Sequence, residues 1–98
     1  MSDELSEIEF RRVADKFIDQ ANERLETVEK ENVGMALLFA AARFNAFVVA
    51  SHSPTLDKYE DDREKAVDFF MSTYRQMLNE NLDDYRRAYK EPPADSEH

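Results

Sequence analysis

Two aspartates one helical turn apart, Asp15 and Asp19, are the residues of this sequence whose type and spacing best suit chemistry. Paired carboxylates can exchange a proton with a substrate and so act as general acid and general base. At about 100° per residue, a helix would place them in one stripe with Arg11 and Asn22, along the border of its apolar face.

A second polar group lies inside the apolar stretch "ALLFAAARFNAFVVASH" at 36–52, where Arg43 and Asn45 interrupt the run. An arginine among small apolar residues needs a partner, and a carboxylate is the acceptor that fits its fork of donors. We expect Arg43 to be buried and paired with the two aspartates of the first stripe, with Asp68 as the alternative. Asn45 is expected to cap or bridge backbone groups of a neighbouring helix.

These residues form one predicted polar constellation, and two interpretations of it remain open. In the first, an ion pair sets the register and orientation of the helices. In the second, the two aspartates and the arginine surround a pocket in a small enzyme or ligand-binding bundle. We favour the structural interpretation and therefore predict no catalytic residue. The constellation consists of Asp15, Asp19, Asn22, Arg43 and Asn45.

The composition argues against several other kinds of chemistry. The 98 residues include no cysteine, two histidines and one glycine, which argues against thiolate chemistry, di-iron sites and phosphate-cradling loops. His52 follows an apolar helix and is expected to interact with its dipole rather than with a metal. We predict no cofactor and no metal. A net charge of −9 argues against nucleic acid, because phosphate binding relies on cationic side chains.

Apolar residues repeat at intervals of three and four over most of the chain, which predicts helices at about 6–28, 33–51 and 57–89. Ser6 and Glu9 form a capping-box pattern, Asn32 can cap the second helix, and Pro54 ends it. The fold class is predicted to be all-α, a three-helix up-down-up bundle with a buried central helix and a long third helix. Residues 1–91 would form a single domain, and 92–98 a disordered tail.

The second predicted helix is apolar on every side, so it must be covered by protein or by lipid. Its longest apolar stretch, 33–50, contains Arg43 and Asn45, which favours a buried core helix over a membrane span. The N-terminal "MSDELSEIEF" is acidic and has no apolar segment of the signal-peptide type. We therefore expect a cytoplasmic protein that does not enter the membrane.

The predicted helix lengths indicate self-association. At 1.5 Å per residue the second helix spans roughly 28 Å and the third roughly 50 Å, so the end of the third helix extends beyond the bundle. A symmetric homodimer would cover the apolar side chains there, and an unidentified protein partner is also expected. A bend at Asn79 or Asn81 is the competing arrangement. The predicted interface consists of Leu78, Leu82, Tyr85 and Tyr89.

Three segments together resemble a family of short bacterial proteins known as domain of unknown function 3144. They are "ADKFIDQAN" from Ala14, "ALLFAAARFNAFVVAS" from Ala36 and "NLDDY" from Asn81, and the resemblance extends over about 10–85. Lys16 and Gln20 depart from the apolar or small residues typical of those places. The resemblance implies an all-helical fold and the shared polar constellation, but no activity. The function remains unknown, and we expect a small acidic interaction module rather than an enzyme.

Overall fold

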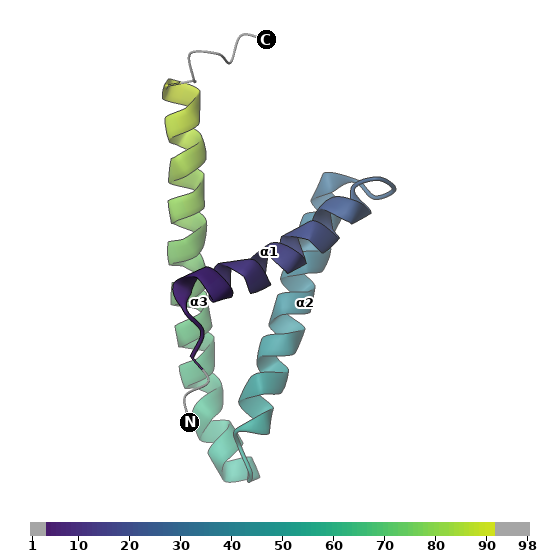
Figure 1. Ribbon diagram of the computed structural model, residues 1–98. Coiled ribbons are helices and arrows are strands. Elements are labelled where there is room, and N and C mark those ends of the chain that lie inside the picture. The colour runs from purple at the N-terminus through teal and green to yellow at the C-terminus, as the bar shows by residue number, and fades with distance from the viewer. Residues whose placement is uncertain (1–3, 92–98) are drawn as a thin grey trace. The chain divides into compact units, whose positions relative to one another are not determined.

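The computed structural model describes residues 4–91, and these form three helices in chain order (Figure 1). Helix α1 spans Glu7–Arg24, α2 spans Lys30–Ser51 and α3 spans Leu56–Lys90. No strand occurs in this described part of the chain, which confirms the all-α class. The up-down-up order stays a prediction, and the expected tail at 92–98 lies outside the described residues.

The ends of α1 follow from local hydrogen bonds. Ser6 Oγ accepts from the backbone N–H of Glu9 at 3.1 Å, and the Glu9 carboxylate accepts from the Ser6 N–H at 3.0 Å. This is the predicted capping box, which satisfies two N–H groups that the first turn leaves free. The helix ends at Arg24, earlier than predicted, because the Leu25 N–H reaches back only three residues, to the Asn22 carbonyl.

Helix α2 begins at Lys30, three residues before the predicted start. The Glu29 carbonyl accepts from the Val33 N–H at 3.0 Å, so the helical pattern is already established there and Asn32 lies within the helix. Among the described helices, α2 alone is long and apolar enough to cross a membrane. Length and composition by themselves do not separate a membrane span from a helix of a soluble protein.

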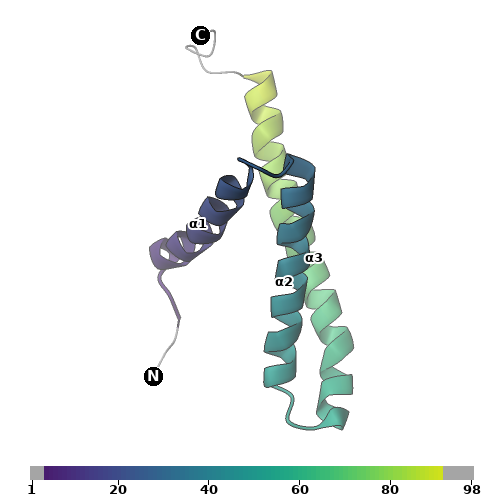
Figure 2. The same ribbon diagram turned by 90° about the vertical axis from the view of Figure 1, so that its right-hand side faces the viewer.

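The chain divides into two compact units, residues 1–48 and 49–98. In the first unit, no described residue is buried, and only a few are half-buried: Ala21, Val33, Asn45 and Val48. The prediction of a buried central helix is therefore wrong for the chain by itself. The physical reason is visible in Figure 1 and Figure 2, where α1 and α2 diverge from the turn that joins them, so that α1 covers little of α2.

In the second unit, a polar corner holds the connection after α2 against the start of α3. The Ser53 hydroxyl has two acceptors within reach, the Asp62 carboxylate at 3.0 Å and the Val49 carbonyl at 2.9 Å, and it shares its hydrogen between them. Lys58 Nζ donates to both oxygens of Asp62, at 2.7 and 2.9 Å. Thr55 caps α3 by accepting from the Lys58 N–H. The direction in which α3 starts is therefore set by hydrogen bonds around one carboxylate.

This corner predicts a pH dependence of stability. The hydrogen bond from Lys58, and then that from Ser53, lowers the pKa of Asp62 from its ordinary 3.8. A carboxylate with a lowered pKa stabilises the fold above its unfolded-state pKa, and this contribution is lost as the pH falls through the folded-state value. We expect wild-type stability to decline below about pH 3.8, and this decline to be smaller in Asp62→Asn. Urea denaturation across a pH series measures it, with Asp83→Asn as the control; equal acid dependence in all three proteins would contradict the prediction.

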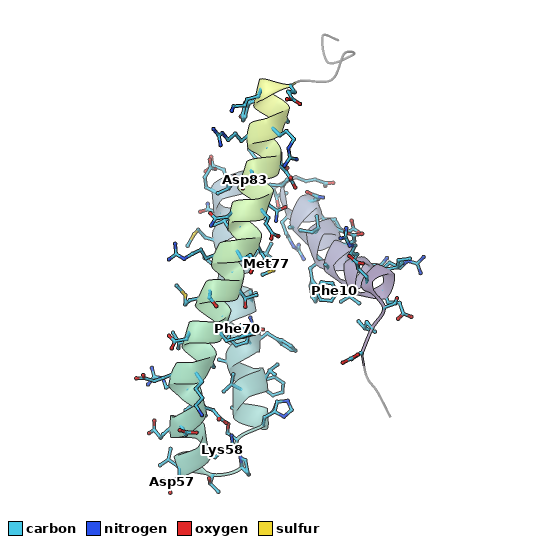
Figure 3. The ribbon with its side chains drawn as sticks, turned by 90° about the vertical axis from the view of Figure 1, so that its left-hand side faces the viewer. Phe10, Asp57, Lys58, Phe70, Met77 and Asp83 are labelled. Carbon is cyan, nitrogen blue, oxygen red and sulfur yellow. The ribbon has the colours of Figure 1, made fainter. Side chains whose placement is uncertain are left out.

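Helix α3 is continuous over 35 residues, and Figure 3 follows it from Asp57 and Lys58 through Met77 to Asp83. The Asn81 side chain donates to the Met77 carbonyl at 2.8 Å, four residues back, without interrupting the helix. The alternative of a bend at Asn79 or Asn81 is therefore wrong. At 1.5 Å per residue, α3 extends for roughly 52 Å.

Candidate functional site

The predicted carboxylate stripe is present on α1 and open to solvent. Asp15, Asp19 and Asn22 are all exposed, so they do not lie at the edge of a core. Arg11, which shares their stripe in the sequence, pairs instead with Glu7 at 3.0 Å. An exposed carboxylate is fully hydrated, and an exposed ion pair of this kind contributes little to stability.

The structure also differs from the prediction for Arg43. Its side chain is exposed, and no ion pair within residues 4–91 joins it to Asp15, Asp19 or Asp68. Arg43 lies in the second half of α2, whereas α1 approaches α2 only near the turn that joins them (Figure 2). The prediction that Arg43 is buried and paired with a carboxylate is therefore wrong for the isolated chain.

Asn45 is the half-buried member of the constellation. Its side chain makes no hydrogen bond to another residue in the described range, so the predicted cap or bridge is absent. The structure does not bring the five constellation residues into one site. Three lie on α1 and two in the second half of α2, away from the turn.

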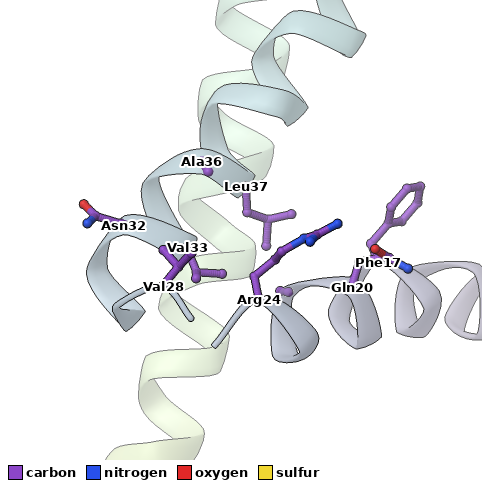
Figure 4. A pocket seen from close by; sticks show the side chains of 9 residues that line it. Phe17, Gln20, Arg24, Val28, Asn32, Val33, Ala36 and Leu37 are labelled. Carbon is purple, nitrogen blue, oxygen red and sulfur yellow. The ribbon is translucent and has the colours of Figure 1, made fainter. Parts of the chain in front are cut away.

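A groove of about 350 Å³ lies where α1 and α2 meet, and sequence reasoning did not foresee it. Figure 4 shows Val28 and Val33 beside the turn, with Leu37 one turn further along α2. Asp15, Asp19 and Arg43 are not among its lining residues, so it does not provide the pocket of the alternative interpretation. The groove is apolar with a polar rim, and its lining comprises Phe17, Gln20, Ala21, Arg24, Val28, Asn32, Val33, Ala36 and Leu37.

An apolar stripe of exposed side chains runs along α3. Leu78, at 42% exposed, and Tyr89, at 87%, belong to the interface that the sequence predicts. The apolar spacing of four and three residues continues beyond this predicted interface toward the N-terminus of α3, and every member is exposed. We call this set the α3 stripe, and it consists of Val67, Met71, Tyr74, Leu78, Leu82, Tyr85 and Tyr89.

The end of α3 is basic although the chain as a whole is acidic. Arg86, Arg87 and Lys90 line a shallow depression of about 320 Å³ together with Asp83. Arg87 pairs with Asp84 at 2.9 Å. The beginning of α3 carries the opposite charge, with six acidic and three basic residues over 56–68. Helix α3 is thus polarised, acidic at its start and basic at its end, which also suits the helix dipole at the basic end.

Among residues 4–91, no three of the His, Asp and Glu side chains gather closely enough to hold an ion. His52 lies just beyond α2 and is exposed. The α1–α2 groove, the α3 stripe and the basic end of α3 therefore remain as the candidate functional surfaces.

The family model described as protein of unknown function (DUF3144) matches residues 10–86. The chain belongs to this family. The match confirms the resemblance that the three sequence segments indicate, and it includes all of the constellation. It also includes the α3 stripe as far as Tyr85, and it ends before Tyr89. No curated protein and no solved structure matches the chain. DUF3144 membership adds no activity to what the geometry indicates.

Proposed function

We propose that this DUF3144 protein is a self-associating helical interaction module that acts through protein–protein contacts. The observation that carries the proposal is the absence of any buried residue in either unit over residues 4–91. Helices are held in water mainly by the packing of their apolar faces, because isolated helices are marginally stable. A partner that covers those faces therefore completes the fold.

The apolar surface left uncovered is large and lies on regular helices. Phe39 and Phe47 on α2 are 67% and 62% exposed, and the α3 stripe adds seven further side chains. Covering apolar surface gains about 25 cal/mol per Å², so association through these faces is strongly favourable. Contiguous exposed patches of this kind mark interaction sites in soluble proteins.

The charges favour a protein partner over the alternatives. A net charge of −9 repels nucleic acid and anionic lipid headgroups. Arg43 would lie near the centre of the bilayer if α2 crossed a membrane, where a cation is costly. We therefore retain a homodimer as the principal assembly, a further protein as the unidentified partner, and the cytoplasm as the location.

Self-association predicts a mass close to twice the 11.5 kDa of one chain, together with a concentration-dependent unfolding midpoint. When folding is coupled to association, mass action raises the midpoint as the protein concentration rises. Sedimentation velocity and thermal unfolding over a hundredfold range of concentration measure both quantities. A strict monomer at the highest concentration, with a midpoint that does not move, would show that the chain covers its own apolar surface and would overturn the proposal.

A further inference from the structure

We propose that two copies of the chain pair through the α3 stripe with their α3 helices antiparallel, about a two-fold axis at Leu78. This inference rests on the proposed self-association and adds its orientation and register. The second copy is the occupant that the α3 stripe itself indicates, through the symmetry of its spacing and through the charges beside it.

The α3 stripe has the same spacing when read in either direction. Its members follow one another at intervals of four, three, four, four, three and four residues, and Leu78 is the midpoint. An antiparallel two-fold axis at Leu78 therefore places each member of the α3 stripe opposite a member on the second copy. Val67 then faces Tyr89, Met71 faces Tyr85, Tyr74 faces Leu82, and Leu78 faces its own copy.

These pairings suit the shapes of the side chains. Each tyrosine of the α3 stripe faces an aliphatic or methionine side chain rather than another tyrosine, so large and smaller residues alternate across the interface. Methionine also makes favourable contacts with aromatic rings, which fits Met71 opposite Tyr85. A parallel two-fold pairing would instead place each tyrosine against its own copy. Pairs of tyrosines would then alternate along the interface with pairs of smaller side chains.

The charges beside the α3 stripe provide a second, independent argument. At 100° per residue, one flank of the α3 stripe carries the charged residues Asp61, Glu64, Asp68, Arg75, Arg86 and Lys90. An antiparallel two-fold axis brings this flank against the same flank of the second copy. Asp68 then lies within about 3 Å of Arg86 along the helix axis, and Glu64 is equally close to Lys90.

A parallel pairing has the opposite electrostatic result. It brings the basic ends of the two α3 helices together, with Arg86, Arg87 and Lys90 of one copy beside those of the other. It also brings the two acidic beginnings together. Like charges placed side by side suppress a pairing, whereas complementary charges set its register. The polarised charge of α3 thus selects the antiparallel arrangement.

Engineered cysteines test the orientation directly, because the natural chain has none. Met71→Cys and Tyr85→Cys are prepared as separate full-length proteins, oxidised alone and as an equal mixture, and their masses are measured by sedimentation beforehand. A disulfide needs Cα atoms within about 7 Å, whereas in the antiparallel register each of these positions lies about 21 Å from its own copy along the axis. We expect the mixed disulfide in the mixture and almost no disulfide in either protein alone. Gln76→Cys is the control: it lies only about 6 Å from its own copy along the axis, but it faces away from the α3 stripe and should not cross-link.

The possible outcomes separate the inference from the proposed function. If the Met71→Cys protein and the Tyr85→Cys protein each form disulfides when oxidised alone, but form none with each other in the mixture, the antiparallel register is overturned and self-association stands. Dimers that form no disulfide at any of these positions would also overturn the inference, since another surface would then hold the copies together. A strict monomer would overturn both proposals. A yield of mixed disulfide at least tenfold above the disulfide yield of either protein alone supports the antiparallel register.

Discussion

Leu82→Asp combined with Tyr85→Asp is expected to convert the dimer into a monomer. Both residues lie in the α3 stripe, and a symmetric dimer loses four apolar side chains at once. Burial of one such side chain is worth about 1.5–3 kcal/mol, and each introduced carboxylate would also have to leave water. The dissociation constant should therefore rise by at least about 10⁴-fold, which corresponds to roughly 5.5 kcal/mol. Sedimentation velocity at micromolar concentration measures the change.

The matched control places the same two charges on another face of the same helix. Ser72→Asp with Gln76→Asp adds two carboxylates to α3 away from the α3 stripe, and this protein should remain a dimer. In the Leu82→Asp, Tyr85→Asp protein, the unfolding midpoint should no longer depend on concentration. If both double variants keep the wild-type mass, the α3 stripe is not the interface.

Local signals in the sequence were sufficient for the secondary structure. The capping box depends only on Ser6 and Glu9, and the break after α2 depends on Pro54, so both could be predicted without knowledge of the fold. Boundaries were less certain where no strong signal occurs. Leu25 and Val28 continue the apolar spacing of three and four residues beyond Arg24, so the first helix is predicted to end four residues too late.

The environment of each helix could not be predicted in the same way. Periodicity shows which side chains must be covered, but it does not show what covers them. Helix α2 is apolar all round, which led to the expectation of a buried centre, whereas α1 diverges from it and leaves Arg43 in water. Arg43 could pair with Asp15 and Asp19 only if α1 packed along the second half of α2, and no local pattern in the sequence determines how two helices pack. The α3 stripe was partly predictable because its regular spacing is a property of one helix.

The exposed position of Arg43 leads to the second large expected effect, that of Arg43→Leu. After Lys30 and Glu31 in its first turn, α2 has one charged residue, Arg43. An arginine at the centre of a membrane span costs about 2.5–3.5 kcal/mol on insertion scales, whereas a leucine there is favourable by about 0.3–0.6 kcal/mol. The substitution therefore favours membrane insertion of α2 by roughly 3–4 kcal/mol, which is more than about a hundredfold in partition.

Wild-type protein should accordingly be released from cell membranes by alkaline carbonate, while Arg43→Leu protein should remain largely in the membrane pellet. Arg75→Leu removes the same charge from α3, where no apolar span results, and this control should stay out of the membrane as the wild type does. Wild-type protein that itself resists carbonate extraction would contradict the prediction that the chain stays out of the membrane. Arg43→Leu protein that stays soluble would mean that protein contacts cover α2 more favourably than lipid does. With the expected result, one guanidinium keeps an otherwise membrane-compatible helix in water, where a protein partner can bind it.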